Sequence, residues 1–532
     1  MIIPLILSLL PIVLVLVLLL VFNKSGHFSG FLAWVVTALV VVFFFQTKLE
    51  VVLRSTLAGC IRSFPNTLMI MFSILQVTVM EKHGAIRRIT VLFKTLAPGD
   101  KASQVMMLNI GFGTLMVAVG ATPVSALPAL LLGMGYTSFQ AIALPAIGYD
   151  SLCTYALLGA PIVVFYDIAN GYLGKGHEVT LVQCGSIFYY FLPLVSTSIG
   201  LAMLYIVDRW KGIRKGWFPC LLVGATVAIV AKWTNSVENL VCLTGLITSV
   251  GVILVQMAYL KLKGGRIYDP SVLTEEDRAI ARSYPLWRAF LPWVFLIAAV
   301  LSLNLPKASF NWLFNTMRMR LSGITANGGP LDLRLLWQAY TWCLISIVVT
   351  LPFLMTSRQK VKDSWASFLK RAPKPVLSSL AYFAIGEIMN MSGYNMAENR
   401  FVGPNMVRIM ADFSAHAFGR AYGAFVSYIG LVGGFITGSE ASAVAMLGRY
   451  SMLTAANRHY GLRGLLVIAA GVAFGGGLAS VITPVKLQNA AAVIDRLGEE
   501  NAVLRVTMVF SLIFCAVTAV LVLVLTGVFA GS

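Results

Sequence analysis

Four ionisable residues stand inside long apolar stretches of this chain, where charge is unexpected: Asp150, Glu387, Glu440 and Lys486. A charged side chain at membrane depth is costly, so it marks a functional site unless it is paired or lies at a segment end. Carboxylates in such places can bind and release protons, and a lysine can hold an anion. We therefore predict Asp150, Glu387 and Glu440 as proton-coupling candidates and Lys486 as a candidate anion ligand.

Glu440 follows an interruption in the chain. Residues 430–447 begin as an apolar run, break at Thr437, Gly438 and Ser439, and resume with Glu440 at the head of a small-residue helix. Unpaired backbone groups are costly in lipid, so a break at this depth predicts a cavity or a solute path. Glu440 is our first candidate for the coupling carboxylate. Alternatively, it is a first-turn acid that serves only the helix dipole.

Three further breaks accompany this one. In the first half, residues 115–127 break at Gly120 and resume with Thr122 and Pro123, an N-cap followed by proline at the first helical position. Each half also has a second break downstream, at 157–161 and at 474–484. Apolar segments interrupted at corresponding places in two halves indicate a transporter site. Alternatively, these small residues only allow helices to pack closely.

The breaks also predict the charge of the ligand. A broken helix exposes backbone N–H groups at its N-terminus, and these donors and the helix dipole favour an anion. Small residues let a small solute approach the backbone. The substrate-binding candidates are therefore Gly120, Thr122, Ser125, Gly438, Ser439, Thr483 and Lys486.

Three of the charged candidates also have a plain structural interpretation. Lys486 could extend along a helix end toward the membrane surface. Glu387 could pair with a basic side chain. Asp150 could form a local hydrogen bond as a turn residue.

The composition predicts a membrane protein. Of 532 residues, 58% are hydrophobic and 11% are charged, against about 25% charged in ordinary soluble domains. The net charge of +19 could suggest nucleic acid, but the basic residues gather in short loops between apolar runs, as in cytoplasmic membrane loops. We therefore expect a lipid bilayer and no nucleic acid as partner. The four basic loops are 82–101, 209–215, 261–282 and 358–374.

Apolar runs of about 20 residues, enough to span a bilayer, recur from residues 2–22 to 503–529. Residues 2–22 lack the basic start and cleavage site of a signal peptide and are predicted as the first membrane helix. We expect an all-α polytopic membrane protein with two transporter halves, 1–260 and 286–532, joined by a cytoplasmic linker at 261–285.

Some of the topology stays open. Residues 103–134 are expected to form either two short passes or one pass with a re-entrant loop, because the crossings between two cytoplasmic loops must be even. The short runs that could form re-entrant halves are 123–134, 441–447 and 484–494.

Several kinds of chemistry find no support in the sequence. The seven cysteines form no CxxC pair or zinc pattern, and the five histidines are scattered without metal spacing or a Ser-His-Asp arrangement. No phosphate-binding P-loop is present. We therefore predict no cofactor, no metal and no enzymatic activity, and we do not expect ATP-driven pumping by this chain.

The residues around Glu440 carry a family resemblance. YIGLVGGFITGSEAS (428–442) resembles the LGxxGxFLTGSDTSSN motif of the L-lactate permease family of bacterial and archaeal secondary transporters, with Glu440 in the acidic position. Stretches that resemble further family motifs are ITP (482–484), FSLIF (510–514), NMSG (390–393) and DRWKGIRKGW (208–217). The sequence departs from the family at MVAVGATP (116–123), which is shorter than LEGAAGFGAP and lacks its glutamate, and at ASAV (441–444).

The resemblance implies a fold of two inverted repeats with re-entrant hairpins. It also implies uptake of 2-hydroxymonocarboxylates such as lactate and glycolate, coupled to protons, and it adds Asn390 to the substrate-binding candidates. We expect a secondary transporter in the cell (inner) membrane, with Glu440 taking the coupling proton. The alternatives are sodium coupling with another small carboxylate or sulfonate, the ion held by carbonyls near Gly438 and Gly475, and a passive anion channel.

Overall fold

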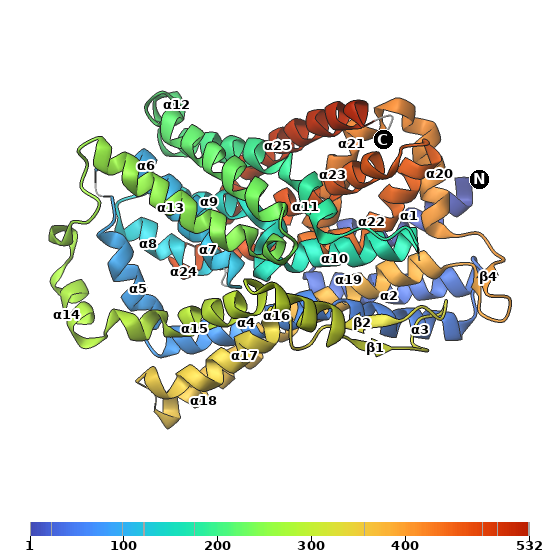
Figure 1. Cartoon of the computed structure of the whole chain (residues 1–532), viewed down its shortest axis with the longest axis horizontal. Helices are drawn as coiled ribbons and strands as arrows, with labels where there is room; N and C mark the ends of the chain where they lie inside the picture. The colour runs from blue at the N-terminus through green and yellow to red at the C-terminus, as the bar shows by residue number, and fades with distance from the viewer. Residues whose placement is uncertain are drawn as a thin grey trace.

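The computed structural model describes residues 2–22, 24–97, 99–120, 123–174, 176–355, 357–480, 482–496 and 498–529. Helices make up almost all of it (Figure 1), which confirms the all-α prediction. Within the described ranges, nine helices are long and apolar enough to cross a membrane. The chain is therefore a multi-pass membrane protein.

The helices up to residue 262 include two regions of short, interrupted segments. They are α1 (Ile2–Leu20), α2 (Gly26–Phe43), α3 (Leu49–Arg62), α4 (Phe64–Lys82), α5 (Ala85–Lys94), α6 (Lys101–Val105), η1 (Met106–Phe112), α7 (Gly113–Ala118), η2 (Pro123–Ser125), α8 (Leu127–Gly133), α9 (Ser138–Gly148), η3 (Tyr149–Tyr155), α10 (Ala156–Leu173), α11 (Leu181–Tyr189), α12 (Leu192–Asn235), η4 (Glu238–Leu243) and α13 (Thr244–Leu262).

The rest of the chain adds two small antiparallel hairpins, β1–β2 and β3–β4, to its helices. The elements are η5 (Pro270–Val272), α14 (Glu275–Ser283), α15 (Leu286–Asn304), α16 (Lys307–Asn311), η6 (Trp312–Thr316), β1 (Met319–Leu321), β2 (Leu331–Leu333), α17 (Ala339–Thr350), η7 (Leu351–Phe353), α18 (Arg358–Arg371), α19 (Pro373–Met391), β3 (Tyr394–Asn395), β4 (Arg400–Phe401), α20 (Met406–Phe418), η8 (Gly419–Ala421), α21 (Tyr422–Thr437), α22 (Glu440–Asn457), α23 (Leu462–Ser480), α24 (Pro484–Val493) and α25 (Glu500–Val528).

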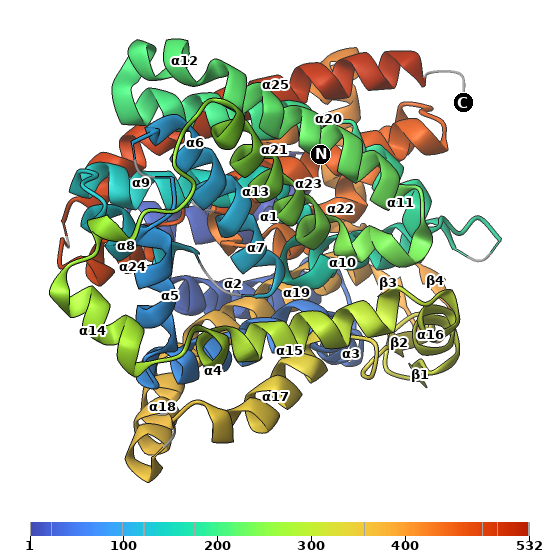
Figure 2. The same cartoon turned by 60° about the vertical axis from the view of Figure 1, so that its left-hand side comes forward.

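The molecule has two distinct ends. In Figures 1 and 2, α5 and α14 lie at the left end and the β-strands lie at the right end. At the left, Lys94 of α5 donates to Asp277 of α14 at 2.8 Å, which joins two of the predicted basic loops. We call the left the basic end and the right the hairpin end. The shared position of these loops agrees with a single cytoplasmic side.

One predicted loop at the basic end is instead helical. α12 consists of two helices that meet at a bend, where Asp208 and Arg209 leave helical geometry. A Cβ atom on Gly212 would collide with the carbonyl oxygen of Leu204, so only glycine allows the second helix to fold back this tightly. The basic residues of 209–215 therefore lie on the helical turn that follows the bend.

The first re-entrant hairpin consists of α6, η1 and α7 in one limb and η2 and α8 in the other. The Tyr136 hydroxyl, just beyond α8, donates to Oε1 of Gln104 in α6 at 2.9 Å. The two ends of the hairpin therefore lie together at the basic end. The chain reverses after Gly120, whose φ of +87° suits glycine, and it returns to its starting end, as the expected even number of crossings requires.

The second re-entrant hairpin consists of α21 and α22 and opens at the hairpin end. α21 follows α20 along the chain, and Asn457 at the end of α22 donates to Asp412 of α20 at 2.6 Å. Its tip is Gly438, a left-handed C-cap with φ of +68°. Residues 441–447, predicted as a run that could form a re-entrant half, belong to α22, a helix of 18 residues that forms one limb of this hairpin.

Each hairpin is followed by an interrupted span. In the first half, this span is divided into α9, η3 and α10, with Leu157, Leu158 and Gly159 at φ of +54°, +54° and +82°. In the second half, α23 and α24 are separated before Pro484. Both halves thus place a re-entrant hairpin before an interrupted span, and the two hairpins enter from opposite ends. An inverted repeat would produce this order, and that relation stays a prediction.

Candidate functional site

The four breaks meet inside the molecule. A Cβ atom on Gly438 would lie 3.6 Å from Cγ2 of Thr483, and one on Gly120 would lie 3.7 Å from Cδ2 of Leu157. α24 packs against η2, and α23 packs against η3, so the two halves also contact each other here. We call this region the junction, and its described residues include Gly120, Thr154, Leu157, Gly438, Glu440, Gly477 and Thr483.

Glu440 is buried in the junction with a side chain from the other half. Only 3% of Glu440 is exposed. The Thr154 hydroxyl of η3 donates to Oε1 of Glu440 at 2.7 Å, and Cys153 provides a further hydrogen bond. Among the residues that the structure describes, no basic side chain lies within 4.0 Å of this carboxyl group. The carboxyl group is therefore buried without an ion-pair partner among the described residues.

The local sequence explains how Glu440 reaches this position. Ser439 is the N-cap of α22 and accepts from the Ser442 N–H at 3.4 Å. The Thr437 hydroxyl donates to the Ser439 carbonyl at 2.9 Å and fixes the turn. The helix end is thus capped by its own residues, while Glu440 bonds across to η3. A first-turn acid that only stabilised the dipole of its own helix would not need Thr154 of η3 as a hydrogen-bond donor.

Two neighbouring glycines of α23 make room for different groups. A Cβ atom on Gly475 would collide with the Ser427 carbonyl of α21, so Gly475 allows α21 and α23 to pack closely. A Cβ atom on Gly477 would instead lie 2.7 Å from Oε2 of Glu440. The first glycine serves helix packing, and the second makes room for the carboxyl group.

The structure describes only some of the remaining candidate residues of the junction. Thr122 lies outside the described residues, as do the side chains of Ser125 and Asp150. The backbones of Ser125 and Asp150 belong to η2 and η3, which reach the junction. Thr483 is buried and caps the start of α24. Lys486 stands in the first turn of α24, beside the junction and not at an outer end of the molecule.

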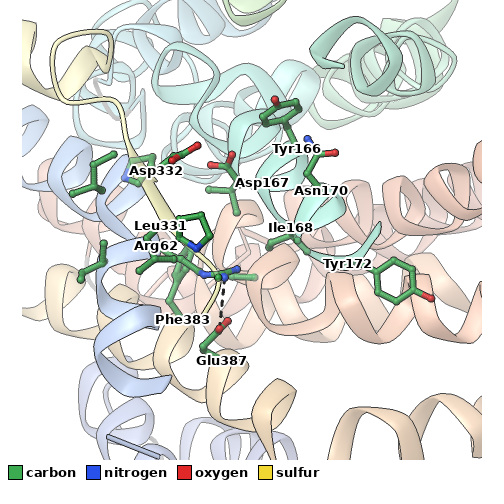
Figure 3. A pocket seen from close by; sticks show the side chains of 18 of the residues that line it. Arg62, Tyr166, Asp167, Ile168, Asn170, Tyr172, Leu331, Asp332, Phe383 and Glu387 are labelled. Carbon is green, nitrogen blue, oxygen red and sulfur yellow. Dashed lines mark ion pairs between the residues drawn. The ribbon is translucent and has the colours of Figure 1, made fainter. Parts of the chain in front are cut away.

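Glu387 and Asn390 lie elsewhere, on α19. They line a cavity of about 530 Å³ toward the hairpin end, between α10, α19, α22 and the β1–β2 segment (Figure 3). Small-molecule pockets typically span about 300–1,000 Å³. The charged residues that line the cavity are Arg62, Asp167, Glu178, Arg318, Arg320, Asp332, Arg334, Glu387 and Arg449.

Ion pairs bind most of these charges to one another. Figure 3 shows the Arg62 guanidinium of α3 directed at Glu387, which confirms the paired interpretation of Glu387. Asp167 of α10 also reaches the cavity and pairs with Arg334. The pairs are Arg62–Glu387 (3.7 Å), Arg334–Asp167 (3.3 Å), Arg318–Asp332 (2.8 Å) and Arg320–Asp332 (3.3 Å).

The sequence reasoning did not single out Arg62 or Arg449. Arg449 stands within AVAMLGRYSML (443–453), a run of small and apolar residues where the rule for intramembrane charge would have marked it. Arg62 ends α3 directly before the helix restarts at Phe64. Its position resembled a segment end, so only the fold shows that it faces a cavity.

A comparison with known protein families identifies the chain. The model of the L-lactate permease family matches residues 4–529. The chain belongs to this family. The glycolate permease GlcA of Escherichia coli is 23% identical over 98% of this chain and 96% of its own length. The L-lactate permease of Salmonella typhi is 22% identical over 93% of this chain and 91% of its own length.

Solved structures add little to this identification. MtrF of Neisseria gonorrhoeae aligns with a TM-score of 0.40 at 12% identity, covering 88% of this chain and 83% of its own. The YdaH transporter of Alcanivorax borkumensis aligns with a TM-score of 0.40 at 14% identity, covering 89% and 88%. Likeness at this level carries no argument. Family membership and the multi-pass fold together support a transport function.

Proposed function

We propose that the protein is a secondary active transporter that carries a small 2-hydroxymonocarboxylate, such as lactate or glycolate, by proton symport across the cell (inner) membrane. The relatives named as L-lactate and glycolate permeases support the substrate class. The observation that carries the coupling proposal is Glu440, buried against Thr154 with no cation beside it among the described residues. An unpaired buried charge is costly, so this carboxyl group is suited to bind and release a proton.

The substrate carboxylate is proposed to dock where helices begin at the junction. α22 starts after Ser439 and α24 after Thr483, so both helices direct N-terminal N–H groups and the positive ends of their dipoles into this region. Lys486 adds a positive charge in the first turn of α24. In the first half, the corresponding place is the start of η2 at Pro123.

Proton and substrate then cross as a pair. A monoanion and a proton together carry no net charge, so their transfer through a low-dielectric interior avoids most of the cost of moving a bare ion. Glu440 lies between the halves, because its own helix belongs to the second hairpin and Thr154 belongs to the first interrupted span. A movement of one half against the other would therefore change the surroundings of its proton, as alternating access requires.

The test uses the purified full-length protein in proteoliposomes. We expect an inward proton gradient to drive accumulation of labelled L-lactate or glycolate, with saturable kinetics and loss of accumulation when a protonophore is added. Accumulation that requires sodium would overturn proton coupling. A non-saturating flux without accumulation would support an anion channel and overturn the proposal as a whole.

A further inference from the structure

We infer that the cavity at the hairpin end is itself a recognition site for a hydroxymonocarboxylate, in which Arg449 holds the carboxylate and Asn390 accepts the hydroxyl. The inference rests on the proposed function and adds to it a second binding position, separate from the junction. It also names the groups that would select the substrate.

Arg449 differs from the other arginines of the cavity. Those on α3 and on the β1–β2 segment each have a carboxylate within 4.0 Å. Arg449 lines the same cavity but has no ion pair or hydrogen bond with any residue in the described part of the chain. A guanidinium binds a carboxylate through two parallel hydrogen bonds, so an anion from outside the chain can complete its contacts.

The charge balance of the cavity fits an anion with one negative charge. Five arginines and four carboxylates line it. Next to Arg449, the charged residues within electrostatic range are Arg62 and Glu387, which again makes two positive charges against one negative. A bound monocarboxylate neutralises this excess. A dicarboxylate would leave one negative charge uncompensated.

Asn390 supplies a group that can recognise a hydroxyl. It is 8% exposed and lines the cavity, and its Oδ1 atom has no hydrogen-bond partner among the described residues. A buried acceptor without a donor is costly. Asn390 follows Glu387 by three positions on α19, which places both on one face of the helix. A rotation of the Asn390 amide that turns this oxygen into the cavity would let the hydroxyl of a 2-hydroxy acid donate to it.

The cavity and the junction lie along the same helix. Arg449 and Glu440 both belong to α22, nine residues apart, which corresponds to about 13 Å along the axis. Ala445 stands between them and lines the cavity wall. A solute that leaves Arg449 toward the basic end would therefore move along α22 to Glu440.

The first experiment measures binding of L-lactate to the purified full-length protein by calorimetry. We expect Arg449→Gln to weaken binding about tenfold or more, since hydrogen bonds to charged groups contribute about 1.5–3 kcal/mol. The matched control is Arg400→Gln, an exposed arginine at the hairpin end that pairs with Glu398 and lies outside the cavity lining. It should bind within about twofold of wild type. Equal affinities in Arg449→Gln and wild type would overturn the inference.

The second experiment separates the hydroxyl from the carboxylate by comparing L-lactate with propionate, which lacks the hydroxyl. Arg449→Gln should weaken both ligands. Asn390→Leu should weaken binding of L-lactate about fivefold and leave binding of propionate unchanged. Only lactate has a hydroxyl that would lose its hydrogen-bond partner. An equal loss for both ligands in Asn390→Leu would contradict the role of Asn390.

Wild-type protein provides a readout that needs no variant. L-lactate and propionate should bind more tightly than malonate, whose second charge finds no partner, and equal affinities would contradict the charge balance. The wild type also separates the two proposals. If it binds and transports L-lactate while Arg449→Gln binds equally well, only this inference falls. If it binds no hydroxymonocarboxylate, the inference and the proposed substrate fall together.

Discussion

The junction and the cavity both contain a residue of α22, Glu440 and Arg449, but the charges around these two side chains differ. At the junction, Glu440 has a hydroxyl and a thiol as its hydrogen-bonding neighbours, and no cation lies within 4.0 Å among the described residues. In the cavity, Arg449 and Arg62 lie near a single glutamate, Glu387, which pairs with Arg62. A lone carboxyl group in a neutral setting is suited to a proton, and an excess of arginine is suited to an anion. In the proposed symport, the carboxyl group that takes the proton and the arginine that holds the anion are thus placed apart.

The two regions also differ in packing. At Gly477, the space beside Glu440 is too small even for one added methyl group, whereas the cavity has a volume of about 530 Å³. A hydroxy acid therefore has room in the cavity but not between Glu440 and Gly477.

The largest expected effect comes from filling the junction. Gly477→Ala places a Cβ atom 2.7 Å from Oε2 of Glu440, so the carboxyl group must move. Proton-driven uptake should fall about tenfold or more, because a small misplacement of a reacting group is costly. The control is Gly527→Ala on α25, where the added atom meets nothing within 4 Å. Normal uptake by folded Gly477→Ala would show that the close fit around Glu440 is unimportant.

The next prediction tests the excess of positive charge in the cavity. Glu387→Gln removes the partner of Arg62 and leaves two arginines unopposed in the cavity. The affinity ratio of malonate to L-lactate should rise about fivefold, because an uncompensated unit charge at about 4 Å contributes roughly 1 kcal/mol even in bulk water. Calorimetry with both ligands checks this. An unchanged ratio would mean that Glu387 does not set the charge that the ligand meets.

A smaller effect should follow from Thr154→Val, which removes the hydroxyl that donates to Glu440 and preserves the shape of the side chain. Uptake should fall a few-fold, corresponding to about 1 kcal/mol for a lost hydrogen bond. Thr226→Val on α12 is the control, since that hydroxyl only bonds the Leu222 carbonyl one turn before it. Equal uptake in both variants would show that the Thr154 hydroxyl does not contribute to transport.

The smallest effect on transport is expected at the basic end, outside both regions. Asp277 caps α14 and accepts from Lys94 at 2.8 Å. Burial raises its pKa, but the hydrogen bonds from Lys94 and Thr274 outweigh burial and hold the pKa below its ordinary value. Asp277→Asn should leave uptake unchanged and lower the free energy of unfolding by about 1 kcal/mol.

The pH dependence of this contribution follows from its sign. Because the folded-state pKa of Asp277 is depressed, its stabilisation is present above the unfolded-state pKa of about 3.9. It is lost as the pH falls through the lower folded value. Proteolysis of α14 should therefore be faster in Asp277→Asn than in wild type at pH 7, and the difference should vanish in strong acid. A difference that persists there would point to another cause.

The sequence predicted where the chain breaks but not what the breaks contact. Gly120 and Gly438 were predicted as breaks in apolar runs, and both have positive φ. The bond from Thr154 to Glu440 joins residues 286 positions apart and arises only when two halves pack together. The same holds for Glu387, whose partner could be predicted by type but not by number.

The direction of the chain at each break was the harder problem. Residues 103–134 have enough apolar length for a pass, and only the contact between Tyr136 and Gln104 shows that the chain returns to its starting end. Arg449 carried a usable signal, since it interrupts an apolar run. The cavity that Arg449 lines could not be predicted, because it is formed by side chains from four separate segments.

The most direct test of the separation between proton and anion is Glu440→Gln, compared with wild type in two assays on the same proteoliposomes. The variant should lose accumulation driven by a proton gradient, because its side chain cannot bind and release a proton. It should still exchange labelled for unlabelled substrate, because the anion-binding groups remain. Accumulation at the wild-type level in Glu440→Gln would contradict the role of this carboxyl group.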